Sequence, residues 1–273
     1  MVMVEFNGNE SAFSMDGYLS AALDVVQKAI NYNDQDMLVI VDGREGSGKS
    51  TLAFQMAAYV DRDFNLSRVC FTPDQFIECI HTSKKGQAVV FDEAFTGLLS
   101  RQSMSRTNIR LLKILAEVRQ KNLFMVIVMP SIQYLDRYVS VHRSEFLVHV
   151  TLKSLVAKER RFDFYNYDRK EYIMSEKSVI KYKTRPNFYG HNPGWIPFLK
   201  EDYLKKKAEA LYNRSETGPP TEAQTRRKWR QLYINNMLPH RKLLKDSEWA
   251  KIFDLEVFSF RNTITLLKKE GPI

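Results

Sequence analysis

The chain has 273 residues, and its 41 Lys and Arg residues outnumber its 32 Asp and Glu residues, giving a formal net charge of +9. With 44% hydrophobic residues it can bury a core, which excludes a disordered tail. Cys70 and Cys79 are too few for a disulfide-held fold, and the longest apolar runs, 37–41 and 124–129, are far shorter than a membrane span. We expect a soluble, cytoplasmic protein with no signal peptide and no membrane partner.

Helices and strands are predicted to alternate through the first 152 residues. Apolar residues at helical spacing predict helices over 15–30, 49–60, 73–81 and 108–120. Apolar runs without polar alternation predict strands over 37–41, 68–72, 88–91, 124–129 and 146–152. Strands of this kind, separated by helices, are typical of an α/β fold with a parallel sheet between two layers of helices.

Beyond residue 152 the pattern changes. We predict an antiparallel hairpin from 161–167 and 171–175, with its turn at Asp168-Arg169, and a short charged helix over 201–212. The sequence SETGPPT at 215–221 has the composition of a linker. The expected organisation is therefore a core of residues 1–152, a basic extension over 153–214, the linker 215–221 and a small helical domain over 222–273.

Residues 43–50 read GREGSGKS and match the pattern G-x-x-x-x-G-K-[ST]. An apolar strand precedes this P-loop and a helix-forming segment follows it, so backbone N–H groups and the helix N-terminus can bind phosphates. Lys49 would reach the β- and γ-phosphates, and the Ser50 hydroxyl would bind Mg²⁺. We expect ATP and Mg²⁺ as cofactors, with the nucleotide held by Gly43, Arg44, Glu45, Gly46, Ser47, Gly48, Lys49, Ser50 and Thr51.

An acidic strand end completes such a site. The run AVVFDE at 88–93 places Asp92 and Glu93 directly after a predicted strand, about forty residues beyond the P-loop. Asp92 would join Ser50 in holding Mg²⁺, and Glu93 would polarise the attacking water. Because water activation means hydrolysis, this pair favours an ATPase over a small-molecule kinase.

The strand predicted over 124–129 can lie between the two motif strands. Ser131 or Gln133 would then lie near the γ-phosphate as a sensor, although an ordinary turn with Ser131 as the N-cap is an equal alternative. Several arginines surround this region, and one could act on a neighbouring subunit as an arginine finger. Arg119 is the first candidate and Arg143 the second, with a plain surface role as the alternative for each.

These motifs resemble the additional-strand, catalytic-glutamate (ASCE) class of RecA-like P-loop ATPases. The order GREGSGKS, VVFDEA, LLSRQSMSR, EVRQKN, FMVIVMPS and IQYLDRYV is most similar to FtsK/HerA-type translocases, particularly the Zot-like and DNA-packaging ATPases of phages and mobile elements. In that family an Arg before the sensor strand and another after it are functional, which implies Arg119 and Arg143 here. The chain departs from the family in carrying Pro130-Ser131 where Gln is common, and in lacking the membrane span of Zot proteins.

The C-terminal region carries the positive charge. Residues 1–152 carry a net −2, whereas 153–214 carry +7 and 222–273 carry +5. Residues 246–264 can form a helix–turn–helix that presents Arg261 and Asn262 to a DNA groove. Further phosphate contacts would come from Arg226, Arg227, Lys228 and Arg230. The alternatives are a protein-contact module and solvated lysines on helix faces.

Three functional hypotheses follow. The first is an oligomeric, ring-forming ATPase that moves double-stranded DNA, such as a motor that packages a viral genome in the host cytoplasm with other phage or mobile-element proteins. The second is an ATP-switched DNA-binding regulator or replication loader. The third is a small-molecule kinase with an unrelated tail, which Asp92-Glu93 makes the weakest.

Overall fold

The computed structural model describes residues 1–6, 11–92, 94, 106–152, 160–176, 182–192, 194–217 and 245–248. Its internal contacts divide the chain into two compact units, Met1–Ala210 and Leu211–Ile273. The first unit contains the sheet, its covering helices and the candidate site, and the description below concerns that unit.

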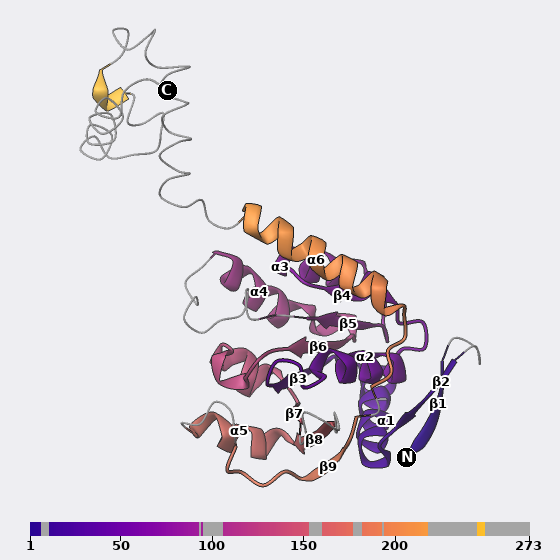
Figure 1. Cartoon of the computed structure of the whole chain (residues 1–273). Coiled ribbons are helices and arrows are strands. Elements are labelled where there is room, and N and C mark those ends of the chain that lie inside the picture. The colour runs from indigo at the N-terminus through magenta and orange to yellow at the C-terminus, as the bar shows by residue number, and fades with distance from the viewer. Residues whose placement is uncertain are drawn as a thin grey trace. The chain divides into compact units, whose positions relative to one another are not determined.

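The first unit is built on a seven-stranded sheet with the strand order β4-β5-β6-β3-β7-β8-β9 (Figure 1). The strands from β4 to β7 in this order pair in parallel, and β8 and β9 are added in antiparallel orientation. Strand β6 lies between β3, which precedes the P-loop, and β5, which precedes Asp92. This is the position predicted for the strand over 124–129. The strands are β3 (Met37–Gly43), β4 (Val69–Cys70), β5 (Ala88–Phe91), β6 (Phe124–Val128), β7 (Phe146–Leu152), β8 (Arg160–Tyr165) and β9 (Phe188–His191).

Helices cover both faces of this sheet, which confirms the predicted layered architecture. Alternate residues of β3 belong to different cores: Val39 and Val41 face one hydrophobic cluster, and Leu38 and Ile40 face the other. The first cluster includes α1 and α2, and the second includes α3, α4 and α5. The helices are α1 (Gly17–Tyr32), α2 (Lys49–Val60), α3 (Pro73–Thr82), α4 (Arg106–Glu117), α5 (Tyr167–Ser175) and α6 (Lys200–Thr217).

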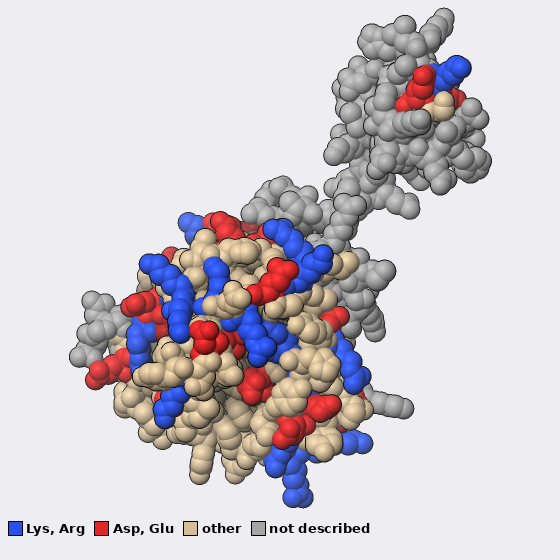
Figure 2. Space-filling model, turned by 180° about the vertical axis from the view of Figure 1, so that it is seen from behind, with Lys and Arg blue, Asp and Glu red and all other residues tan. Residues whose placement is uncertain are grey.

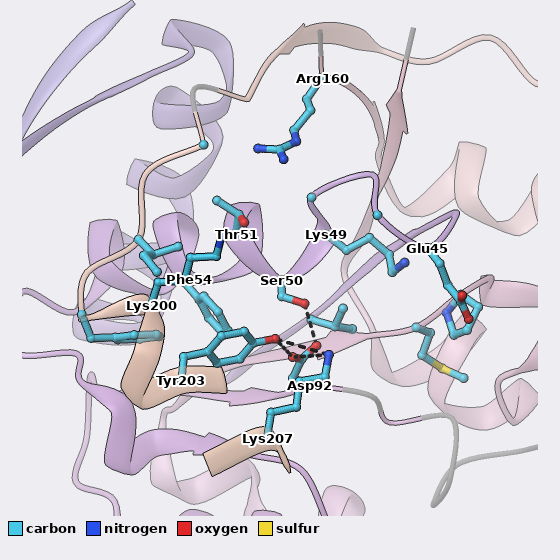
Figure 3. Close-up of a pocket in the computed structure, with 18 of the residues that line it drawn as sticks. Glu45, Lys49, Ser50, Thr51, Phe54, Asp92, Arg160, Lys200, Tyr203 and Lys207 are labelled. Carbon is cyan, nitrogen blue, oxygen red and sulfur yellow. Dashed lines mark hydrogen bonds and ion pairs between the residues drawn. The ribbon is translucent and has the colours of Figure 1, made fainter. Parts of the chain in front are cut away.

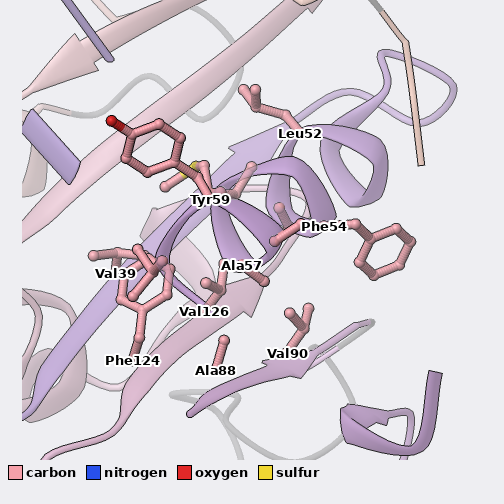
Figure 4. Packing of buried hydrophobic residues seen from close by; sticks show 14 of the residues in the cluster. Val39, Leu52, Phe54, Ala57, Tyr59, Ala88, Val90, Phe124 and Val126 are labelled. Carbon is pink, nitrogen blue, oxygen red and sulfur yellow. The ribbon is translucent and has the colours of Figure 1, made fainter. Parts of the chain in front are cut away.

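Helix α2, which follows the P-loop, lies against the centre of the sheet. Ala53, Ala57 and Ala58 are completely buried, and their small side chains allow the helix to pack closely on β3, β5 and β6 (Figure 4). Because its first turn follows the GREGSGKS loop directly, this packing fixes the position of the loop relative to the strand ends.

A small antiparallel sheet at the N-terminus was not predicted. Strands β1 (Val2–Phe6) and β2 (Ser11–Met15) pair with each other, and Phe13 stacks on Trp195 with ring centroids 4.2 Å apart. Helix α1 therefore begins at Gly17 rather than at residue 15, with the Asp16 side chain accepting hydrogen bonds from the backbone N–H groups of Tyr18 and Leu19.

The predicted hairpin over 161–167 and 171–175 is wrong in its second half. Strand β8 pairs with β7 and β9, and residues 171–175 belong to helix α5. The helix begins where the Asn166 side chain accepts a hydrogen bond from Arg169 N, and it buries Ile173 in the second hydrophobic cluster. The basic extension is therefore continuous with the sheet of the core, rather than a separate element beyond residue 152.

The predicted charged helix over 201–212 is present as α6 and is longer than expected. Residues 215–217, predicted as the start of the linker, form its last turn, and the rest of the linker lies outside the described residues. The predicted helix–turn–helix also lies outside them, apart from residues 246–248. None of the helices in the described ranges combines the length and apolar character needed to cross a membrane.

Candidate active site

The P-loop connects the carboxyl end of β3 to the first turn of α2. Gly46 and Gly48 have φ values of 74° and 96°, a region that residues with a side chain rarely adopt. Lys49 Nζ donates a hydrogen bond to the Arg44 carbonyl oxygen across the loop at 2.8 Å. The loop therefore curves around the start of α2, where backbone N–H groups and the helix dipole favour an anion.

Ser50 and Asp92 come together beside this loop. Ser50 Oγ donates a hydrogen bond to Asp92 Oδ1 at 2.9 Å, and Asp92 is 1% exposed. Asp92 N in turn donates to the Cys70 carbonyl oxygen at 2.8 Å, which anchors the end of β5 against β4. A hydroxyl and a carboxylate oxygen are ligands that Mg²⁺ accepts, so this pair fits the predicted metal site. Glu93 lies outside the described residues.

A cavity of about 780 Å³ opens over these residues (Figure 3). The P-loop, Asp92 and the end of β6 form one side, and residues from the segment 194–207 form another. This volume lies within the range of small-molecule and cofactor sites. The pocket can therefore hold a nucleotide against the P-loop.

Helix α6 contributes a part of the site that the sequence did not reveal. Tyr203 Oη donates a hydrogen bond to Asp92 Oδ2 at 2.6 Å, and Lys207 Nζ lies 4.0 Å from the same oxygen (Figure 3). Both oxygens of Asp92 thus have partners, one from α2 and one from α6. Nothing in the residue pattern connects position 203 with position 92, because the contact exists only through the fold.

Tyr203→Phe should weaken the use of Mg²⁺ by the site. The hydroxyl holds the Asp92 carboxylate in place, and loss of a hydrogen bond to a charged group should raise the Mg²⁺ concentration for half-maximal nucleotide turnover by about 10-fold. Nucleotide turnover measured against Mg²⁺ concentration tests this, with Tyr18→Phe, on the exposed surface of α1, as the control. An unchanged or lower Mg²⁺ requirement would show that Tyr203 does not position Asp92.

A buried polar network surrounds Asp42, the residue before the P-loop. His149 Nδ1 lies 2.7 Å from Asp42 Oδ1, while the other carboxylate oxygen accepts hydrogen bonds from the Tyr182 hydroxyl and from Ile132 N. Asp42 immediately precedes the P-loop, and Ile132 follows β6. The network therefore connects the carboxyl ends of β3, β6 and β7.

The His149–Asp42 pair predicts a pH dependence of stability. Burial lowers the pKa of His149, but the Asp42 carboxylate and its hydrogen bond outweigh burial and leave the pKa raised. A histidine whose pKa is raised in the folded state stabilises the fold at pH values below its pKa in the unfolded chain, which is near 6.5. This stabilisation is lost as the pH rises through the pKa of the folded state.

Denaturant unfolding at several pH values measures this contribution. The free energy of unfolding of the unmodified protein should exceed that of His149→Gln by more at pH 6 than at pH 9. The difference should change by about 1.4 kcal/mol for each unit by which the folded pKa is raised. His81→Gln, at the exposed end of α3, is the control for the replacement of a histidine by glutamine. A difference that grows with pH would contradict the protonated pair.

The two predicted sensor residues do not line the pocket. Ser131 is the N-cap of a 3₁₀ turn and accepts a hydrogen bond from Gln133 N, which confirms the alternative interpretation of that residue. Gln133 Nε2 donates to the carbonyl oxygens of Ile173 and Glu176, at 2.6 Å and 3.2 Å, so its amide points toward α5. Strand β6 has the predicted position, but the two polar residues that follow it bond to the 3₁₀ turn and to the carboxyl end of α5.

The two candidate finger arginines lie at the amino-terminal ends of the parallel strands, opposite the P-loop. Arg119 and Arg143 precede β6 and β7, whereas the P-loop and Asp92 follow the carboxyl ends of β3 and β5. Arg143 pairs with Asp36 and donates to the Leu115 carbonyl oxygen at 2.7 Å, and its side chain is 12% exposed. This geometry disfavours Arg143 as a finger. Arg119 is exposed, and its action on a neighbouring subunit stays a prediction.

Several bases of the segment 153–214 are used within the fold. Lys170 is fully buried, and burial lowers its pKa to about 8. Lys206 Nζ donates to the carbonyl oxygens of Leu66 and Val69, at 2.8 Å and 2.7 Å. Figure 2 shows Lys and Arg intermixed with Asp and Glu on one face of the first unit. The predicted DNA contacts, Arg226, Arg227, Lys228, Arg230, Arg261 and Asn262, lie outside the described residues.

The strand order, the P-loop before α2 and the acidic end of β5 together define a P-loop NTPase, which confirms the class inferred from the motifs. The profile of the family nSTAND3, described as Novel STAND NTPase 3, matches residues 22–178. The chain belongs to this family of NTPases. Among curated proteins, none matches its sequence.

The solved structures that are similar to the chain include two kinds. One is the N-terminal domain of zonular occludens toxin from Neisseria meningitidis, with 16% identity and a TM-score of 0.36 over 55% of this chain and 95% of that chain. The other is the genome packaging NTPase from Sulfolobus turreted icosahedral virus 2 in complex with ATP-gammaS, with 13% identity and a TM-score of 0.35 over 50% of this chain and 94% of that chain.

Proposed function

We propose that this protein is an ATP-hydrolysing, nucleic-acid-dependent motor, an oligomeric DNA translocase of the kind that packages viral genomes. The observation that carries the hydrolytic part is the hydrogen-bonded Ser50–Asp92 pair, placed in a nucleotide-sized cavity beside the P-loop lysine. Mg²⁺, when bound, would supply charge neutralisation at the β- and γ-phosphates.

The residues of this chain divide the work of hydrolysis. The backbone of 46–51 and the Lys49 ammonium bind and orient the phosphate chain, and Ser50 and Asp92 hold the metal. Glu93, the residue that follows Asp92, would accept a proton from the attacking water. An arginine of a second copy, with Arg119 as the candidate, would complete the site in a ring of subunits.

DNA as the partner is supported by the charge of the C-terminal region. Residues 222–273 hold 11 bases and 6 acids. Since Lys170 and Lys206 of the preceding segment are used within the fold, we assign the DNA contact to residues 222–273. Arg226, Arg227, Lys228 and Arg230 would meet the phosphate backbone, and such contacts weaken steeply with salt.

ATP turnover with and without duplex DNA tests the proposal. At low salt, duplex DNA should stimulate turnover, and replacing the four bases at 226–230 with Gln in the full chain should remove the stimulation and flatten the salt dependence of DNA affinity. Lys84→Gln/Lys85→Gln, on the surface before β5, is the matched control. Turnover that DNA leaves unchanged would contradict the motor. ATP-dependent DNA binding without directed movement of a tethered molecule would indicate an ATP-switched regulator instead.

A further inference from the structure

Arg160 lines the same cavity, although its sequence context gave no reason to single it out. It is the first residue of β8 and pairs with Leu152 of β7. Its carbonyl oxygen accepts a hydrogen bond from Asn192 N at 3.2 Å on the other side. The backbone of Arg160 is thus held between two segments, and its side chain extends from a fixed position.

Two glycines make room for this side chain. A Cβ on Gly48 would lie 2.8 Å from Arg160 Cδ, and a Cβ on Gly194 would lie 3.1 Å from Arg160 Nη1. Asn192 Nδ2 also donates to the Gly48 carbonyl oxygen at 3.1 Å, which ties the segment after β9 to the P-loop. Arg160 therefore packs directly on Gly48, the N-cap residue of α2.

The guanidinium is incompletely satisfied. Arg160 Nε is buried and has no hydrogen-bond partner, and among the described residues no carboxylate forms an ion pair with this arginine. A buried donor without a partner is costly, and phosphate oxygens, like carboxylate oxygens, are strong acceptors for a guanidinium. The cavity beside the P-loop is where such an acceptor would lie.

The position of Arg160 selects one part of the nucleotide. Ser50 and Asp92 are the residues that would hold Mg²⁺, and the β- and γ-phosphates would lie beside them. In Figure 3, Arg160 enters the pocket from the side opposite Asp92, with Ser50 and Thr51 between them. We propose that Arg160 binds the α-phosphate of the nucleotide bound to its own subunit, a role that rests on the nucleotide binding proposed above.

Nucleotide binding by the full chain tests this role. Arg160→Met should weaken the binding of ATP and of ADP by the same factor, about 10- to 100-fold, because both carry the α-phosphate. The KM for ATP should rise by a similar factor, while kcat should stay within about twofold of the unmodified protein. Arg160→Lys should recover only part of the affinity, because Lys keeps the charge but lacks the planar pair of donors.

Arg110→Met, at an exposed ion pair on α4, is the control and should change neither constant. Unchanged Kd values for Arg160→Met would overturn the role of Arg160, as would a loss of kcat at unchanged KM, which indicates a contact made only in the transition state. If the unmodified protein and Lys49→Ala fail equally to bind either nucleotide, both the proposed function and the role of Arg160 are wrong. Binding that Lys49→Ala abolishes and Arg160→Met preserves would reject the role of Arg160 alone.

Discussion

Lys49→Ala should abolish nucleotide turnover and weaken ATP binding by at least about 100-fold. The lysine is the first residue of α2, and its ammonium lies over the P-loop, bonded to the Arg44 carbonyl oxygen. When a nucleotide binds, the ammonium would exchange this neutral acceptor for a charged phosphate oxygen. Hydrogen bonds between charged groups are among the strongest in proteins. The variant loses both the charge and the donor.

Calorimetric titration with ATP and a turnover assay measure this effect. The fold should survive, because the side chain is only partly buried and serves the loop rather than a hydrophobic cluster. The thermal midpoint of Lys49→Ala should therefore stay close to that of Lys84→Ala, which changes an exposed lysine. ATP binding retained at the level of the unmodified protein would remove the P-loop from the proposed site.

The central layer of the fold could be predicted because its signals are local. The strands β3, β5, β6 and β7 are uninterrupted apolar runs, and a run that must be buried on both faces has few places to lie other than inside a parallel sheet. The segment 171–175 failed for the opposite reason. Tyr172 is 66% exposed while Ile173 is fully buried. In a segment of only five residues, such an alternation of exposed and buried positions fits a strand as well as one face of a helix.

The site was predicted only where a motif encodes it. Ser50 and Asp92 meet because strands β3 and β5 end at the same edge of the sheet, and each is announced by its own sequence pattern. Tyr203 and Arg160 reach the same cavity from segments more than a hundred residues from the P-loop. A tyrosine in a charged helix and an arginine in a basic segment carry no local signal, so only the folded chain shows them.

Glu93 is the residue on which hydrolysis, as distinct from binding, should depend. It follows Asp92 directly, and Asp92 is fixed by Ser50, Tyr203 and the backbone of β4. A base in this position takes a proton from water as the water attacks, and this contribution to the rate exists only if the side chain is ionised. The amide of Gln has nearly the same shape and cannot accept that proton.

Glu93→Gln should therefore lower kcat by about 10²- to 10⁴-fold and leave the Kd for ATP within a few fold of the unmodified protein. Single-turnover hydrolysis and equilibrium binding separate the two effects. Glu117→Gln, at the exposed end of α4, is the matched control and should change neither. A fully active Glu93→Gln would assign water activation to another group, and a variant that no longer binds ATP would make Glu93 part of the binding site instead. The combination of retained binding and lost turnover would also trap the ATP-bound state, in which the predicted ring of subunits on DNA can be examined directly.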